Sequence, residues 1–255
     1  MLCCSFFFNT INKIMKMANL ILVRHGQSQW NLENRFTGWY DAELTELGKQ
    51  EAKKSGTLIK NLGINFDFAF TSFQKRAINT LAIIIEEINQ KNIKTIKAWQ
   101  LNERHYGGLQ GLNKAETELK HGKEQVMTWR RSYTTKPPKL DKNDPAHPVH
   151  NQIYKSIDPA LIPDTESLLD TYNRAVPFYI NEIETLLKNE KNILVSAHGN
   201  SLRAICKKIF NISDTMITKL EIPTGNPILI KMKKIKIISF EYLDQSRAKE
   251  IISNQ

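Results

Sequence analysis

Two short apolar segments, far apart in the chain, each end at a histidine that is followed by a glycine. The first, 18–23, reads ANLILV and leads into Arg24, His25 and Gly26. The second, 192–197, reads NILVSA and leads into His198 and Gly199. Short apolar runs with polar residues on both sides are typical of buried strands. The chain must therefore bury two strands that each present a histidine at the carboxyl end.

Strand-like and helix-like patterns alternate along the rest of the chain. We expect further strands at 66–70, 93–98, 228–232 and 235–242, and helices at 44–62, 77–88, 167–188 and 201–210. Thr45 is expected to cap the first of these helices, Thr71 or Ser72 the second, and Pro177 should bend or split the third. Such alternation indicates an α/β fold, here a three-layer α/β/α sandwich with a mostly parallel central sheet.

Residues 99–165 differ in texture from the chain on either side. They contain several glycines, a KPPK stretch and the segment DPAHPVH. We expect one or two short helices near 112–131, followed by a long irregular connection of the kind that often forms a cap or lid over a site. The expected organisation is a poorly ordered extension at 1–17, a single domain at 18–245 with this insertion, and a tail at 246–255.

The composition limits the classes of function. A net charge of +10 on 255 residues could indicate nucleic-acid binding, but the lysines are scattered, which favours a lysine-rich surface on an enzyme with an anionic substrate. No apolar run approaches the roughly 18–20 residues of a membrane-spanning helix. Three cysteines provide no disulfide framework, which suits a reducing compartment and a cytoplasmic location. We therefore expect neither a nucleic-acid nor a membrane partner.

The two strand-end histidines indicate where chemistry takes place. In open α/β sheets, ligands bind at the carboxyl ends of the strands, so His25 and His198 would share one crevice if their strands are neighbours. The glycine after each histidine lets backbone N–H groups approach a ligand, and a helix N-terminus favours anions. A single histidine here would more often be structural, but two in the same context indicate a phosphate site.

Longer blocks in the same order carry a family resemblance. The chain contains RHG, SQWNLENRFTGWYD, TSFQKRAINT, LNERHYGGLQGLNKAET, WRR, AHGNSLRA and IPTGNP. In these blocks, from about Asn19 to about Asp244, the chain resembles the cofactor-dependent phosphoglycerate mutases of the histidine phosphatase superfamily. The resemblance implies a phosphoglycerate mutase-like fold. It also implies interconversion of 2-phosphoglycerate and 3-phosphoglycerate in glycolysis and gluconeogenesis, primed by 2,3-bisphosphoglycerate.

The resemblance also assigns roles to individual residues. His25 matches the phosphorylated nucleophile and Glu103 the proton donor and acceptor, while Arg24, Arg76 and His198 match the groups around the transferred phosphoryl. Residues that match substrate contacts are Asn31, Thr37, Gly38, Arg104, Tyr106, Lys114, Arg130, Arg131, Gly199 and Asn200.

The chemistry of these residue types supports the same roles. Arginine presents a planar fork that matches phosphate oxygens, and positive groups spread the charge of a phosphoryl group in transfer. A neutral imidazole can attack phosphorus and form a covalent intermediate. A carboxylate such as Glu103 can exchange the proton of the substrate hydroxyl. Because arginines and histidines supply the positive charge, no metal is expected.

The chain departs from the family pattern at Gln27, where glutamate is usual. Glutamine keeps the capacity for hydrogen bonds but lacks the negative charge, so we expect a modest change in the local potential near His25. The same site could serve a bisphosphoglycerate synthase or phosphatase, and a basic non-catalytic binding protein is the hypothesis from another class. A homodimer or homotetramer is expected from the resemblance alone. His147 and His150 are expected in a surface loop rather than a metal site, and His105 is expected to support the site structurally.

Overall fold

The computed structural model describes residues 17–250, and a six-stranded sheet forms its centre. The strands follow the order β3-β2-β4-β1-β5-β6. The four strands β3, β2, β4 and β1 are parallel, whereas β5 and β6 run antiparallel to their neighbours, so the expected mostly parallel sheet is confirmed. The strands are β1 (Ala18–Arg24), β2 (Phe68–Thr71), β3 (Lys94–Lys97), β4 (Ile193–Ala197), β5 (Ile228–Lys233) and β6 (Lys236–Tyr242).

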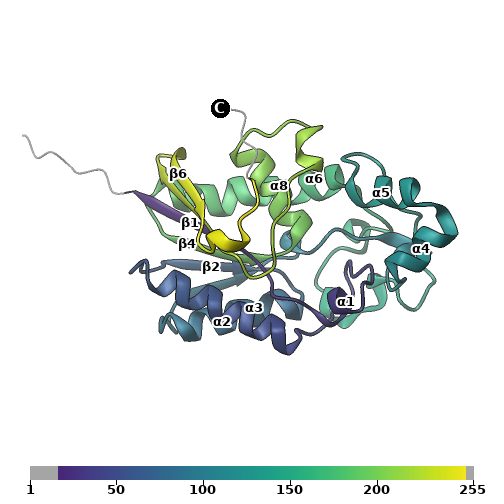
Figure 1. The fold of residues 1–255 in the computed structure, drawn as a ribbon, viewed down its shortest axis with the longest axis horizontal. Helices are drawn as coiled ribbons and strands as arrows, with labels where there is room; N and C mark the ends of the chain where they lie inside the picture. Colours follow the sequence, from purple (N-terminus) through teal and green to yellow (C-terminus); the bar gives the residue numbers. More distant parts are fainter. Residues whose placement is uncertain (1–16, 251–255) are drawn as a thin grey trace, which may run out of the picture.

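Helices cover both faces of the sheet and complete three layers (Figure 1). On one face, Ile21 of β1 packs in a core with Ile59 and Leu81 of α2 and α3. On the other face, Leu22 packs in a second core with Leu202 of α8. Successive side chains of β1 point to opposite faces of the sheet, so the strand contributes to both hydrophobic cores. The helices are α2 (Glu46–Lys60), α3 (Lys75–Glu87), α6 (Leu168–Phe178), α7 (Thr185–Lys188) and α8 (Gly199–Ile209).

Residues 99–165 extend beyond one end of the sheet (Figure 1). The short helices expected near 112–131 are α4 (Lys114–His121) and α5 (Lys123–Arg131). From there to α6, the chain forms only 3₁₀ turns, at Pro148–His150, Gln152–Tyr154 and Pro159–Leu161. A further short helix, α1 (Gln29–Leu32), follows the first histidine. A role for 99–165 as a cap stays a prediction.

Two expectations about helix ends have different outcomes. Thr45 caps α2, because its side chain accepts a hydrogen bond from the backbone of Gly48. The expected cap of the next helix at Thr71 or Ser72 is wrong, since α3 begins at Lys75 after an uncapped Gln74. The Ser72 hydroxyl instead lies 2.7 Å from Nε2 of His198. Ser72, which was expected to cap a helix, thus contacts the strand-end histidine His198 instead.

Pro177 leaves the helical path continuous but changes its hydrogen bonding. It lies inside α6, which passes directly into a π-helical segment at Tyr179–Glu184 and then into α7. The missing N–H of proline removes one hydrogen bond of the α pattern, and wider turns are a known way to absorb such a loss. Instead of a split, the helix changes type after Pro177, and the expected bend stays a prediction.

The interpretation of His147 as a surface-loop residue is wrong. Its side chain is buried, with Nε2 3.3 Å from Oδ1 of Asp164 and the ring 6.2 Å from that of His105. The segment around it folds inward because it packs on a small core that includes Trp39 and Tyr154. Among residues 17–250, no group of three potential ligands forms a metal site.

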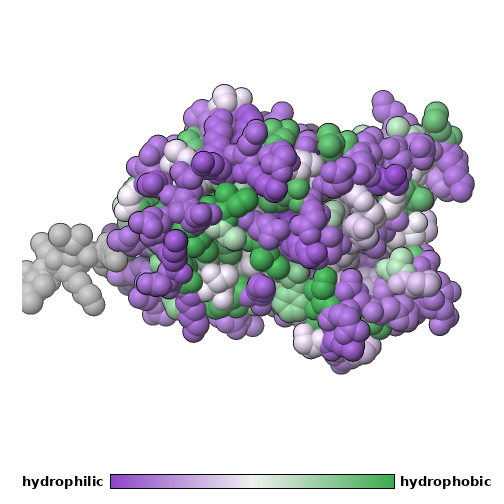
Figure 2. Space-filling model, turned by 90° about the horizontal axis from the view of Figure 1, so that it is seen from below, coloured by the Kyte–Doolittle hydropathy of each residue, from purple (hydrophilic) through white to green (hydrophobic). Residues whose placement is uncertain are grey.

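The outer surface agrees with the scattered lysines of the sequence. Hydrophilic residues cover most of the face on the α2 and α3 side, with apolar residues among them, singly and in small groups (Figure 2). No helix between residues 17 and 250 is long and apolar enough to cross a membrane. The expectation for the extension at 1–17 falls, apart from Met17, outside the described residues.

Candidate active site

The two strand-end histidines lie side by side, as their sequence context predicted. β1 and β4 are parallel neighbours, and Arg24 is in register with Ala197. The backbone N–H of His25 donates to the carbonyl of Ala197 at 2.9 Å. The rings of His25 and His198 consequently lie 5.0 Å apart, centroid to centroid. Both histidines are buried at the carboxyl ends of the parallel strands.

The hydrogen bonds of His25 define which ring nitrogen is available for chemistry. Nδ1 lies 2.7 Å from the carbonyl oxygen of Gly26, which only accepts, so Nδ1 carries the proton. Nε2 then holds the lone pair, and Nε of Arg76 donates to it at 3.3 Å. Burial, together with the charges of Arg76 and Arg24, holds the pKa of His25 well below its usual range. The imidazole is therefore neutral at neutral pH, with Nε2 free of a proton.

Arg76 is fixed in place by backbone carbonyls. Its Nη1 donates to the carbonyl of Tyr40 at 2.8 Å and its Nη2 to the carbonyl of Gly38 at 2.9 Å. The side chain is fully buried, and burial lowers the pKa of Arg76 to about 10, still far above neutral pH. The guanidinium is thus a permanent, rigid positive charge next to Nε2 of His25.

Glu103 lines the same cavity as His25 and is held through one of its two carboxylate oxygens. Oε1 accepts from the amide of Asn200 at 2.8 Å, from the backbone N–H of Asn200 at 3.2 Å and from the backbone N–H of Arg104 at 2.7 Å. Oε2 accepts no hydrogen bond within the described chain, and it faces the position where a Gly199 Cβ would lie, at 3.7 Å. One carboxylate oxygen is therefore an anchor and the other is available to a ligand.

A cavity of about 300 Å³ opens beside these groups. Eight arginine and lysine side chains line it, against only two glutamates. One of these, Glu221, is paired with Arg131 at 2.6 Å. The cavity is therefore strongly positive, and its size and charge suit a small molecule that carries several anionic groups.

The structure gathers most of the residues that the sequence singled out around this cavity. The predicted residues that line it are Arg24, His25, Asn31, Thr37, Gly38, Arg76, Glu103, Tyr106, Lys114, Arg130, Arg131, Gly199 and Asn200. His198 and Arg104 lie behind the wall. His198 packs against His25, and the guanidinium of Arg104 stacks on the ring of Tyr106 at 4.5 Å.

Sequence reasoning missed several residues of the wall, of which Arg203 is the most informative. Its Nη1 donates to the side-chain oxygen of Asn200 at 3.1 Å, and its Nε is buried without a partner. Burial lowers the pKa of Arg203 to about 10, so it remains charged. The sequence spacing could have identified Arg203 as a wall residue, because Arg203 follows Asn200 by three residues and therefore lies on the same face of α8. Other wall residues that were missed are Arg35, Phe36, Leu220, Glu221, Ile222, Pro223 and Lys249.

Similarity to known proteins shows to which family this chain belongs. Residues 20–151 match the model of the histidine phosphatase superfamily, branch 1. A 2,3-bisphosphoglycerate-dependent phosphoglycerate mutase of Pelagibacter ubique (strain HTCC1062) is 55% identical over 92% of this chain and 99% of its own length. The chain belongs to the histidine phosphatase superfamily and, within it, to the cofactor-dependent phosphoglycerate mutases.

Other relatives agree with this placement among the mutases. A protein of the same name from Xylella fastidiosa (strain 9a5c) is 47% identical over 92% of this chain and 97% of its own. The crystal structure of the phosphoglycerate mutase of Bacillus anthracis str. Sterne superposes with a TM-score of 0.61 at 21% identity, covering 89% of this chain and 93% of that one. That likeness confirms the phosphoglycerate mutase-like fold.

Proposed function

We propose that this chain interconverts 2-phosphoglycerate and 3-phosphoglycerate through a phosphoryl group carried on Nε2 of His25. The names of the two close relatives support the reaction. The observation that carries the mechanism is the hydrogen bonding of His25, with Nδ1 protonated toward Gly26 and Nε2 unprotonated beside Arg76. A nucleophile in this state needs no base to activate it.

The chain's own groups can perform both halves of the reaction. In the first half, Nε2 of His25 would accept the phosphoryl group, with an N–P bond forming as an O–P bond of the donor breaks, and Glu103 in its acid form would give a proton to the leaving oxygen. In the second half, Glu103 takes the proton of a phosphoglycerate hydroxyl as that oxygen attacks the phosphorus on His25 and the N–P bond breaks. Arg24 and Arg76 spread the charge in both steps.

The residues present fit 2,3-bisphosphoglycerate as the priming donor. Several buried donors at the cavity have no partner within the described chain, and such groups are costly unless a ligand satisfies them. They are Nε of Arg24, Oγ1 of Thr37 and Nε of Arg203. When bound, 2,3-bisphosphoglycerate supplies the phosphoryl group that first loads His25. Lys114, Arg130 and Arg131, which line the cavity, would hold the carboxylate and the second phosphate.

An enolase-coupled assay with 3-phosphoglycerate tests this function. We expect turnover that depends on catalytic amounts of 2,3-bisphosphoglycerate, and His25→Ala should lower kcat by roughly a thousandfold or more. His121→Ala, at an exposed position on α4, is the matched control and should keep full activity. Turnover that ignores 2,3-bisphosphoglycerate, or a wild-type rate in His25→Ala, would overturn the proposal.

The same assay separates the related activities of this site. A bisphosphoglycerate phosphatase would release inorganic phosphate faster than it forms 2-phosphoglycerate, and a synthase would accumulate 2,3-bisphosphoglycerate. We further propose a cytoplasmic enzyme that works without a metal and assembles as a homodimer or homotetramer. Full activity after treatment with a chelator would support catalysis without a metal, and light scattering of the purified protein measures the oligomeric state.

A further inference from the structure

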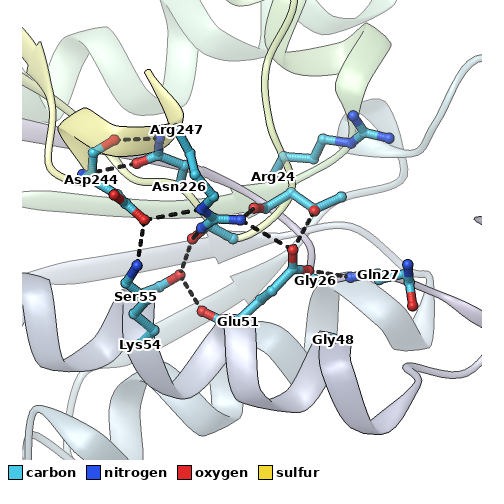
Figure 3. A network of polar contacts seen from close by, with 12 residues as sticks. Arg24, Gly26, Gln27, Gly48, Glu51, Lys54, Ser55, Asn226, Asp244 and Arg247 are labelled. Carbon is cyan, nitrogen blue, oxygen red and sulfur yellow. Dashed lines mark hydrogen bonds and ion pairs between the residues drawn. The ribbon is translucent and has the colours of Figure 1, made fainter. Parts of the chain in front are cut away.

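Glu51 of α2 joins three segments that are distant in sequence, close to the proposed nucleophile. Its Oε2 accepts from the backbone N–H of Gln27 at 2.7 Å. Its Oε1 accepts from the hydroxyl of Thr224 at 2.8 Å and from Nη1 of Arg247 at 3.1 Å. The carboxylate is 13% exposed, so water competes little for these contacts. Figure 3 shows Glu51 between the turn at Gly26 and Gln27 and the C-terminal segment.

The peptide group between Gly26 and Gln27 connects Glu51 with His25. Its N–H is the group that donates to Glu51, and its carbonyl is the group that accepts from Nδ1 of His25. A single planar peptide thus bonds a carboxylate at one end and the nucleophilic imidazole at the other. A negative charge on the N–H side polarises the peptide and strengthens its carbonyl as an acceptor.

The turn that carries this peptide has little freedom to move. A Cβ on Gly26 would lie 2.1 Å from the carbonyl oxygen of Gly48, and a Cβ on Gly48 would lie 2.0 Å from that of Gln27. Thr80 also accepts from the N–H of Gly26 at 3.1 Å. Because Gly48 and Glu51 are three residues apart on α2, they present the same helix face to the turn. The close approach of the turn to α2 brings the carboxylate of Glu51 within hydrogen-bond distance of the N–H of Gln27.

Arg247 holds the other oxygen of Glu51. Besides that contact, its guanidinium donates to the carbonyls of Thr224 and Gly225 at 3.1 and 3.0 Å and to Asp244 at 2.9 Å. Asp244 in turn pairs with Lys54 at 2.6 Å (Figure 3). With every contact of Arg247 directed at a fixed group, Glu51 has one preferred side-chain position, in which Oε2 faces Gln27.

We propose that Glu51 is a positioning residue for the nucleophile, a role that rests on the proposed function of His25. Acting through the Gly26–Gln27 peptide, its charge keeps Nδ1 of His25 protonated and Nε2 unprotonated and aimed at the phosphoryl group. Arg247 sets the orientation of Glu51. A carboxylate that orients a catalytic histidine directly is a known arrangement, and here a peptide group stands between the two.

The test compares Glu51→Gln with Lys54→Met. Glutamine keeps the size of the side chain and one acceptor but removes the charge. Lys54 belongs to the same network, but its ammonium group pairs with Asp244 and not with the carboxylate of Glu51, whose partners are Gln27, Thr224 and Arg247, and this makes Lys54 the matched control. Two quantities are measured: the single-turnover rate of His25 phosphorylation by 2,3-bisphosphoglycerate, and the tautomer of His25 by ¹⁵N NMR of the free protein.

We expect Glu51→Gln to slow phosphorylation about tenfold and to give a mixture of His25 tautomers, while Lys54→Met leaves both unchanged at a similar melting temperature. A wild-type rate and tautomer in Glu51→Gln would overturn the proposal. Equal losses in both variants that follow their melting temperatures would overturn it too, since they indicate a purely structural role.

Two further arms keep the test decisive. If Glu51→Gln fails to fold, Arg247→Met is measured instead, because it retains the Glu51 carboxylate but no longer fixes its orientation. We expect Arg247→Met to slow phosphorylation of His25 two- to threefold. Arg247→Lys should not restore the rate, because lysine cannot form the same set of hydrogen bonds. An unchanged rate in Arg247→Met would contradict the role given to Arg247. The tautomer of His25 is measured without substrate, so it tests the effect of Glu51 on His25 separately from the reaction. If the wild-type protein never forms phosphohistidine, the proposed function fails, but the tautomer still shows whether Glu51 acts on His25.

Discussion

At the scale of single residues, the contacts of His25 explain why a buried histidine can act as a nucleophile. Gly26 fixes its tautomer, and burial beside two arginines keeps it neutral. The sequence indicated a phosphate site from two strand-end histidines, but it could not indicate the tautomer, which depends on a carbonyl one residue away and on the folded turn. Nor could it predict Ser72 as the contact of His198, because hydroxyl residues near a helix start favour capping.

Arg203 provides a test of the cavity wall at this scale. Its partly unpartnered guanidinium should contact a substrate anion, so Arg203→Met should raise KM for 3-phosphoglycerate about tenfold or more with a smaller effect on kcat. Lys207→Met, one turn further along α8 and paired with Asp214, is the control and should leave KM unchanged. Steady-state kinetics of both variants measure this. A wild-type KM in Arg203→Met would remove Arg203 from the binding site.

Gln27 beside the nucleophile is expected to have little influence on the rate. Its side-chain oxygen accepts from the hydroxyl of Thr45 at 3.0 Å, at the positive end of α2. Gln27→Glu would place a charge where the helix dipole favours it, so we expect a gain in unfolding free energy of about 0.5 kcal/mol and a phosphorylation rate within roughly twofold. Urea unfolding and single-turnover kinetics check this. A tenfold change in rate would show that this side chain acts on His25 after all.

At the scale of elements, the sequence predicted best where hydrophobic periodicity is strong. The buried strands β1 and β4 and the helices α2 and α8 fall close to the expected ranges, because their apolar patterns leave little choice. The segment around His147 differs from the prediction because prolines and polar residues are typical of surface loops, whereas here packing on the core that includes Trp39 and Tyr154 buries the segment. Irregular segments take their positions from tertiary packing, which no local pattern reveals.

The turn between β5 and β6 stores strain that one substitution should release. Lys234 and Ile235 have φ values of 46° and 65°, and a β-branched residue is unfavourable in this region. Because Ile235 is 41% exposed, Ile235→Gly loses little packing, and we expect the free energy of unfolding to rise by about 0.5–1 kcal/mol. Ile238→Gly, in the middle of β6, is the control and should be destabilising. Urea unfolding measures both, and a loss of stability in Ile235→Gly would contradict the strain.

At the scale of the whole molecule, the sheet order brings together chemistry from both halves of the chain. β1 supplies Arg24 and His25, β4 leads into His198, and the connection after β3 brings Glu103 to the same cavity. The family blocks made this gathering predictable for most of the wall. The contribution of the C-terminal segment through Arg247 and Lys249 was not predictable, because it depends on ion pairs with α2 that have no pattern in the sequence.

The buried histidines predict how stability depends on pH. Burial is the main cause that lowers the pKa values of His25 and His198, and it lowers that of His105 to about 3. The unfolded chain binds protons at these sites below about pH 6.5 and the folded chain does not, so stability falls as the pH drops.

Between pH 6.5 and 5.5 we expect the three histidines to reduce the free energy of unfolding by about 3 kcal/mol. Urea unfolding at several pH values measures this loss. His105→Gln should make the dependence less steep, and His121→Gln, at an exposed site, should leave it unchanged. A free energy of unfolding that stays constant or rises on acidification would contradict the neutral state of these side chains.

The position of the phosphoryl group on the protein tests the proposed role of His25 most directly. After a short reaction with 2,3-bisphosphoglycerate, NMR of the ¹⁵N-histidine-labelled protein locates the phosphorus on one ring nitrogen of one residue. We expect phosphorylation of Nε2 of His25, because Nδ1 is occupied by its hydrogen bond to Gly26. Phosphate on Nδ1, on His198 or on any other residue would contradict it.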